Sequence, residues 1–147
     1  MNEIAPFIVL IVSFLMFSVI GFFEFPLDEW QTSLRLAIAV MFLFTAMAHW
    51  GKRRAGLINM VPPSLPNPNF IVTLTGILEI IGAIGLLIPL TSKIASICLA
   101  ILLIVMFPAN IHAAKLSVKI GESPVTSLLP RTVLQIIFVT TVILAGT

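Results

Sequence analysis

The sequence is poor in charge, and this shortage indicates the class of protein. Of its 147 residues, 10% are charged and 59% are hydrophobic, and the mean hydropathy is +1.17. This composition lies far outside the usual range of a soluble domain and indicates an integral membrane protein. The net charge of +2 does not indicate nucleic-acid binding, because the basic residues stand beside apolar runs, as in the positive-inside pattern of membrane proteins.

Cysteine is nearly absent as well. The one cysteine, Cys98, lies inside an apolar run, so the chain can form no internal disulfide and has no C-x-x-C pair. Dithiol chemistry within one chain is therefore excluded, and we interpret Cys98 as a small apolar filler. Sequence repeats and low-complexity tracts are also lacking, so residues 1–147 are predicted to form a single transmembrane domain.

Five apolar runs are long enough to cross a bilayer as helices, at residues 6–23, 34–50, 70–89, 93–114 and 131–145. The first is interpreted as a retained anchor helix, because no Lys or Arg precedes it and no small-residue cleavage site follows. Between the second and third runs, dense proline predicts a stiff extended segment, or a short interfacial helix followed by one. Thr91 and Ser92 are predicted to cap the start of the fourth helix, and Pro108 to kink it.

The basic residues predict the orientation of these spans. Two of the eight, Arg35 and Lys93, fall on one side of the five-span arrangement, and six fall on the other: Lys52, Arg53, Arg54, Lys115, Lys119 and Arg131. The positive-inside rule places the N-terminus and both long loops in the cytoplasm and the C-terminus outside. We expect the membrane to be a bacterial cytoplasmic membrane.

Glu79 lies at the middle of the third run. An ionisable group at the bilayer centre costs about 3 kcal/mol on insertion scales, so it normally faces a protein interior and is by default a functional hypothesis. A carboxylate that only fixes helix register is the structural alternative. Its predicted partner is either Arg35, reaching in from the outer side, or Gln135 through a water, with Thr75 in the same network.

Other polar residues are candidates for the same site. The second run places small and polar residues on one stripe, which we expect to face inward: Arg35, Ala39, Phe42, Ala46 and His49. Asn110 is interpreted either as a link between helices or as a partner for backbone freed by Pro108. Arg131 is expected to contact lipid headgroups, or to be a counter-charge to Glu79 or to an anionic ligand.

Two histidines near one membrane face raise the question of haem. We do not favour bis-His ligation by His49 and His112, because His112 lies on the other side of its helix from Asn110. If Asn110 faces the bundle, an ordinary interfacial histidine is the better interpretation of His112.

Five motifs, in order, resemble those of the DoxX-like family of small membrane proteins: FTAMAHW, MVPPSLPNP, LTGILEIIGAIGLLIP, FPANIHAA and LPRTVLQ, over about residues 35–138. The resemblance puts eight residues at motif positions: His49, Pro63, Glu79, Pro89, Pro108, Asn110, Arg131 and Gln135. Ala46 stands where the family commonly has glycine, and the first run is an addition to the usual core. The resemblance implies a four-helix bundle, here about residues 34–146, and links to quinone-coupled or thiol redox systems or to membrane-protein assembly.

The expected protein is therefore an all-α membrane protein, a DoxX-like four-helix bundle with one additional N-terminal span. We expect an accessory or ligand-binding subunit of a redox or quinone-detoxification system, without a cofactor of its own and not an enzyme by itself. A quinone or other apolar ligand would be held by Glu79, Arg35, His49, Asn110, Arg131 and Gln135.

Several alternatives remain open at this point. Besides the lipid bilayer, the expected partner is a membrane or redox protein, and self-association is a further alternative. An assembly factor or scaffold with a purely structural polar core is the second functional hypothesis. A small transporter is less favoured, because paired half-length spans are not found.

Overall fold

Helices make up most of the structure, a computed structural model that describes residues 4–23, 30–116, 119–120, 123–124 and 127–147. Five helices are long and apolar enough to cross a membrane: α1 (Ala5–Phe23), α2 (Trp30–Ala46), α4 (Pro68–Leu87), α5 (Ser92–Leu116) and α6 (Leu128–Gly146). Each end lies within about one turn of the predicted residue, so the five helical spans are confirmed.

Three shorter elements complete the described chain. A 3₁₀ turn, η1 (Met47–His49), continues directly from α2, and a short helix, α3 (Arg54–Met60), follows it. The strands β1 (Lys119–Ile120) and β2 (Ser123–Pro124) pair antiparallel. The short helix of the second interpretation of the proline-rich connection is confirmed by α3, but residues 61–67 after it form turns and bends rather than an extended segment.

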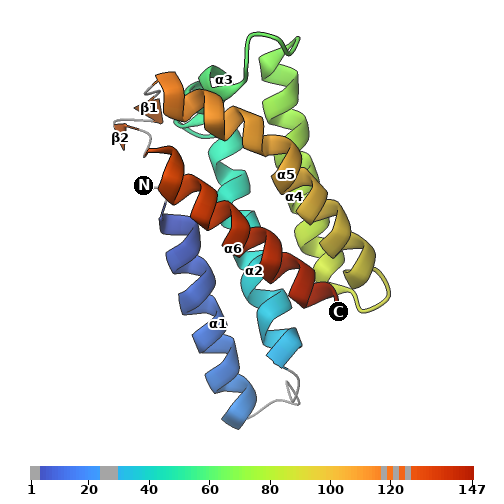
Figure 1. Cartoon of the computed structure of the whole chain (residues 1–147). Helices are drawn as coiled ribbons and strands as arrows, with labels where there is room; N and C mark the ends of the chain where they lie inside the picture. The colour runs from blue at the N-terminus through green and yellow to red at the C-terminus, as the bar shows by residue number, and fades with distance from the viewer. Residues whose placement is uncertain (1–3, 24–29, 117–118, 121–122, 125–126) are drawn as a thin grey trace.

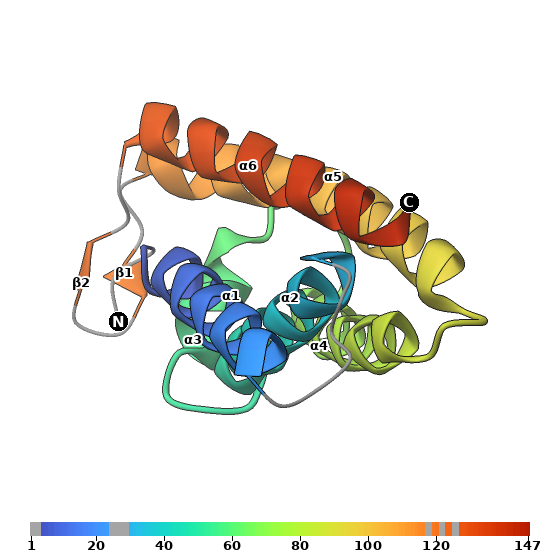
Figure 2. The same ribbon diagram turned by 90° about the horizontal axis from the view of Figure 1, so that it is seen from below.

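The long helices form two layers around α2. Helices α1, α2 and α4 lie in a row, and α5 and α6 lie side by side across that row (Figures 1 and 2). Successive long helices run in alternating directions (Figure 1). Half of the α2 span is buried, against 11% of α1, so α2 is central and α1 is a peripheral addition.

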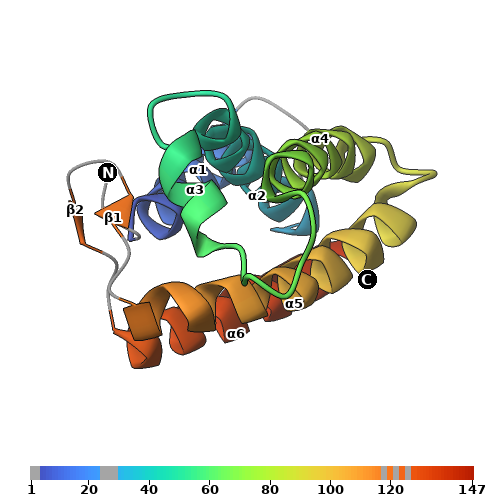
Figure 3. The same ribbon diagram turned by 90° about the horizontal axis from the view of Figure 1, so that it is seen from above.

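One end of the bundle carries the longer connections. Figure 3 looks onto this end and shows α3 beside β1 and β2, with the start of α1 nearby. The predicted gathering of both long loops at one end is therefore confirmed as geometry. The orientation of this end toward the cytoplasm stays a prediction.

Small residues let the helices approach one another. A Cβ on Gly82 of α4 would lie 2.4 Å from Leu99 Cδ2 of α5, and one on Gly146 of α6 would lie 2.4 Å from Ser96 Cβ of α5. The Ser96 hydroxyl donates a 2.7 Å hydrogen bond to the Val142 carbonyl of α6. The α4–α5 and α5–α6 contacts thus depend on close backbone approach, as is usual for helices in membranes.

The predicted inward stripe of α2 is confirmed in its buried members, which are Ala39, Phe42, Ala46 and His49. Arg35, which begins the stripe near the start of α2, is half-buried, and its Nε donates a 2.7 Å hydrogen bond to the Ala145 carbonyl of α6.

The turn before α5 differs from its predicted capping. The Thr91 hydroxyl donates to the Gly85 carbonyl at 2.8 Å, and the Ser92 hydroxyl donates to the Pro89 carbonyl at 3.1 Å. Both hydroxyls therefore serve carbonyls at the end of α4 and in the turn, rather than amides of α5. Four carbonyls at a helix end have no partner within the helix, and this accounts for the reversed role.

We predict that Gly82→Ala destabilises the bundle by about 1–3 kcal/mol, the usual cost of overpacking a core. The added methyl would overlap the end of the Leu99 side chain, which is 1% exposed and must shift to make room. Unfolding by a denaturing detergent, followed by helical circular dichroism, measures the loss. Ile81→Val, at the adjacent lipid-facing position, is the control and should change stability by less than about 0.5 kcal/mol.

Candidate functional site

Glu79 lies in the middle of α4 and faces α2 in the interior of the bundle. Its side chain is 5% exposed, and its Oε2 accepts a 2.9 Å hydrogen bond from the Thr45 hydroxyl in the last turn of α2. The same hydroxyl lies 3.0 Å from the Phe42 carbonyl of its own helix. The Thr45 hydroxyl has one proton to donate, so Glu79 shares this donor with the Phe42 carbonyl.

His49 is the second titratable group of the site. It ends the 3₁₀ turn, its side chain is 5% exposed, and its Nε2 lies 4.0 Å from Glu79 Oε1. This distance is too long for a direct hydrogen bond but short enough for an ion pair when the imidazole is protonated. The two groups can hold one proton between them, either as an ion pair or as a neutral acid beside a neutral imidazole.

The other ring nitrogen of His49 leaves the site incomplete. Nδ1 is buried and makes no hydrogen bond of standard geometry with the described residues, although the backbone of Thr45 and Ala46 lies close to the imidazole. Buried polar atoms in native proteins nearly always have a partner, and an unsatisfied one costs about 1–3 kcal/mol. The site therefore has an incompletely satisfied ring nitrogen on the imidazole whose other nitrogen faces the carboxylate.

Gly76 makes room for the imidazole. It lies one turn before Glu79 on α4, and a Cβ there would be 2.8 Å from both Cβ and Cγ of His49 and 2.9 Å from Trp50 Cη2. The absence of a side chain thus allows the end of α2 and its 3₁₀ turn to pack directly on α4, which brings His49 to the depth of Glu79.

Arg54 joins the two elements that carry the site. It is the first residue of α3, and its Nη1 donates a 2.7 Å hydrogen bond to the His49 carbonyl. Its Nη2 donates to Thr73 Oγ1 at 2.8 Å and to the Asn69 carbonyl at 3.1 Å, both in the first turns of α4. The charge distribution predicts for this arginine a role in topology, and its hydrogen bonds give it a specific structural role as well.

The two predicted partners of Glu79 are engaged elsewhere. Arg35 donates to the Ala145 carbonyl, and Gln135 Nε2 donates a 2.6 Å hydrogen bond to the Leu103 carbonyl of α5. Within the part of the chain that the structure describes, the ion-pair contact of Glu79 is with His49. The Thr75 hydroxyl is not in this network, because it donates to the Ile71 and Val72 carbonyls of its own helix.

The remaining candidates form a second polar group between α5 and α6. Arg131 is 7% exposed, and its Nη1 donates a 2.8 Å hydrogen bond to Asn110 Oδ1. Asn110 is therefore a link between helices, as one of its two interpretations proposed. His112 is half-buried on α5, where its Nδ1 lies 3.1 Å from the Met60 carbonyl at the end of α3. The six predicted site residues thus form two separate pairs, Glu79 with His49 and Arg131 with Asn110, while Arg35 and Gln135 bind backbone carbonyls elsewhere.

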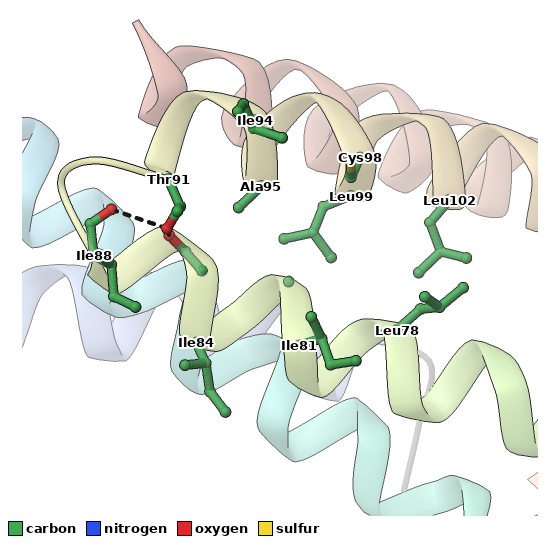
Figure 4. Close-up of a pocket in the computed structure, with 12 residues that line it drawn as sticks. Leu78, Ile81, Ile84, Ile88, Thr91, Ile94, Ala95, Cys98, Leu99 and Leu102 are labelled. Carbon is green, nitrogen blue, oxygen red and sulfur yellow. Dashed lines mark hydrogen bonds between the residues drawn. The ribbon is translucent and has the colours of Figure 1, made fainter.

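An apolar groove of about 490 Å³ lies between α4 and α5 (Figure 4). Its walls are aliphatic except for Thr91 and Cys98, and it extends from Thr91 at the turn to Leu78 and Leu102 (Figure 4). The Thr91 hydroxyl is already used by backbone carbonyls. The groove and the Glu79 carboxylate lie on different sides of α4, because Glu79 faces α2.

Three residues of the site were missed by sequence reasoning: Thr45, Gly76 and Arg54. Gly76 was detectable in principle, because it precedes Glu79 by three residues and so shares its helix face. Thr45 lies one turn before His49 but is off the stripe that we drew through Arg35. Nothing in the sequence distinguishes Arg54 from the basic residues beside it.

Metal ligands do not gather in the described residues, where no three His, Cys, Asp or Glu side chains lie close enough to hold an ion. Comparison with known families gives one match, to a model described as "Domain of unknown function (DUF8561)", over residues 38–145. Neither the curated proteins nor the solved structures contain a match to this chain. The matched range includes Glu79, His49 and their neighbours and excludes α1.

We predict that Thr45→Val destabilises the protein by about 1–3 kcal/mol, because Glu79 would lose its hydroxyl donor while remaining buried. Thr75→Val is the matched control, since this hydroxyl serves only its own helix one turn away. It should change stability by less than about 0.5 kcal/mol. Detergent unfolding of the two variants measures the difference, and equal losses would contradict the assigned hydrogen bond.

We also predict that Gly76→Ala displaces the imidazole from Glu79. The added methyl would meet the Cβ and Cγ of His49, which are close to the backbone and cannot rotate away. The nitrogen resonances of His49 in ¹⁵N-histidine-labelled protein should shift, while those of His112 should stay in place. An unchanged His49 spectrum would show that the ring does not pack on this glycine.

Proposed function

The chain belongs to the DUF8561 family, and because that description names no activity, we propose a function from the site itself. The protein is an integral membrane, DoxX-like, ligand-binding accessory subunit that holds a quinone-like molecule at the Glu79–His49 pair. It acts with a membrane or redox protein that supplies the electrons.

The observation that carries the proposal is the buried Nδ1 of His49, which makes no hydrogen bond of standard geometry with the described residues, on a ring whose Nε2 faces a buried carboxylate. An intramembrane carboxylate is a functional hypothesis by default, and an orphaned nitrogen beside it favours a ligand over a purely structural role. The site offers an imidazole N–H and a carboxylate oxygen, so it suits a ligand with both a carbonyl and a hydroxyl form.

Quinones have these two forms. The oxidised ring presents carbonyl oxygens that accept hydrogen bonds, and the reduced ring presents hydroxyl groups that donate them. The imidazole of His49 can donate to the first, and the carboxylate of Glu79 can accept from the second. The apolar bundle and the surrounding bilayer match the hydrocarbon part of such a molecule.

The site must open for a ring-sized ligand to enter. Both side chains are 5% exposed, and they lie where α2 and its 3₁₀ turn pack on α4. Binding therefore requires α2 and α4 to separate at the His49 end, which predicts that association is slow compared with diffusion.

The test is titration of the protein in lipid nanodiscs with a short-tailed benzoquinone, followed by quenching of tryptophan fluorescence. Trp50, next to His49, lies close enough to Gly76 to report on the site. We expect saturable binding that weakens about tenfold or more in Glu79→Gln, the change expected on loss of a charged hydrogen-bond acceptor. Thr75→Val is the control and should bind as the unchanged protein does.

The hydrogen bonds that other polar groups make favour a second function, that of an assembly factor or scaffold. Several of these groups donate to backbone carbonyls on other elements and so hold elements together; these are Arg35, Arg54, Ser96 and Gln135. If the polar core is only structural, no saturable quinone binding occurs and Glu79→Gln affects stability alone. That result would overturn the ligand-binding proposal in favour of the scaffold.

A further inference from the structure

Arg54 differs from the basic residues beside it in what it contacts. Its guanidinium bridges the carbonyl of His49, at the end of η1, and the hydroxyl of Thr73, in the first turns of α4. A third bond reaches the Asn69 carbonyl, also in α4. None of these three bonds involves Lys52, which is exposed, or Arg53. One side chain therefore ties the element that carries His49 to the helix that carries Glu79.

The contacts of Arg54 lie on the backbone of His49 itself. A carbonyl at the end of a helical turn has no partner within the turn, so it needs an external donor. The charged Nη1 meets this need with a 2.7 Å bond, in the short range expected for a charge-assisted donor. This bond fixes the orientation of the last peptide of η1. It therefore also fixes the direction in which the His49 side chain extends from the backbone.

The other side of His49 is limited by Gly76, against which its Cβ and Cγ pack. The residue is thus held between the α4 surface and the arginine that binds its carbonyl. Helix α3, from which Arg54 extends, is itself held at its far end by the His112 contact to the Met60 carbonyl. Helix α3 is therefore attached to its neighbours at both ends, through Arg54 at its start and through the Met60 carbonyl at its end.

We propose that Arg54 is the positioning residue of the Glu79–His49 site, through its bridge from the His49 carbonyl to the start of α4. The role depends on the two-pronged guanidinium, since a lysine carries its donors on one atom and cannot span both acceptors equally well. The ligand at this site rests on the proposed function above, but the placement of the imidazole does not.

The experiment measures the imidazole directly, without any ligand. The described residues include both histidines of the chain, so ¹⁵N-histidine labelling in nanodiscs gives two ring spectra, assigned with His112→Gln. In Arg54→Ala we expect the His49 ring resonances and their titration with pH to shift. The same measurements in Arg53→Ala, which removes an equal charge at the adjacent residue, should match the unchanged protein.

Two variants distinguish a positioning role of Arg54 from an effect of its charge or an effect on protein stability. Arg54→Lys keeps the charge and should restore the fold but only part of the His49 spectrum. If Arg54→Ala lowers stability while the His49 spectrum is unchanged, or if Arg53→Ala shifts it equally, the proposal is wrong. Should Arg54→Ala not fold, the comparison of Arg54→Lys with Arg53→Lys decides in the same way.

Quinone titration of the same variants keeps the two proposals distinguishable. If the unchanged protein binds quinone, Arg54→Ala should weaken binding by about tenfold, because a displaced imidazole loses its own hydrogen bond to the ligand, and Arg53→Ala should not. If the unchanged protein binds none, the proposed function fails, while the His49 spectra still decide the role of Arg54.

Discussion

A carboxylate inside a membrane-spanning bundle needs hydrogen-bond donors in the interior of the protein, because lipid cannot supply them. In this chain the requirement falls on the contact between α2 and α4, where Glu79 meets the Thr45 hydroxyl and the His49 imidazole. Three features make that contact possible. The 3₁₀ turn ends α2 at the right depth, Gly76 lets it pack on α4, and Arg54 binds its last carbonyl.

Polar side chains elsewhere in the bundle meet the same constraint differently. Several donate to backbone carbonyls on other elements, as Ser96 does to Val142 and Gln135 does to Leu103. Such bonds fasten helices together where hydrophobic attraction between them is weak. The Glu79 cluster contrasts with them, since a buried ring nitrogen of His49 makes no hydrogen bond of standard geometry within the described part of the chain. This contrast separates a candidate binding site from polar groups that hold the fold.

Two faces of helix α4 pack against different helices. Gly76 and Glu79 face α2 and form the polar site, whereas Gly82 and Gly85 face α5, where the apolar groove lies. A mobile α4 would therefore alter both sides together. The hydrogen bonds from Arg54 to Asn69 and Thr73 limit this movement at the end of α4 nearest His49.

Composition and hydropathy were enough to predict the membrane class, the five spans and the inward stripe of α2, because burial in lipid demands long apolar runs. Position in the third span was likewise enough to identify Glu79 as exceptional. Its partners were not predictable, since side chains from different helices meet according to crossing angle, register and the end of each helix. Arg35 and Gln135 have suitable chemistry but lie against other carbonyls, while an ordinary threonine reaches the carboxylate. The sequence by itself therefore determined which residue needed partners, and only the tertiary structure decided which residues they are.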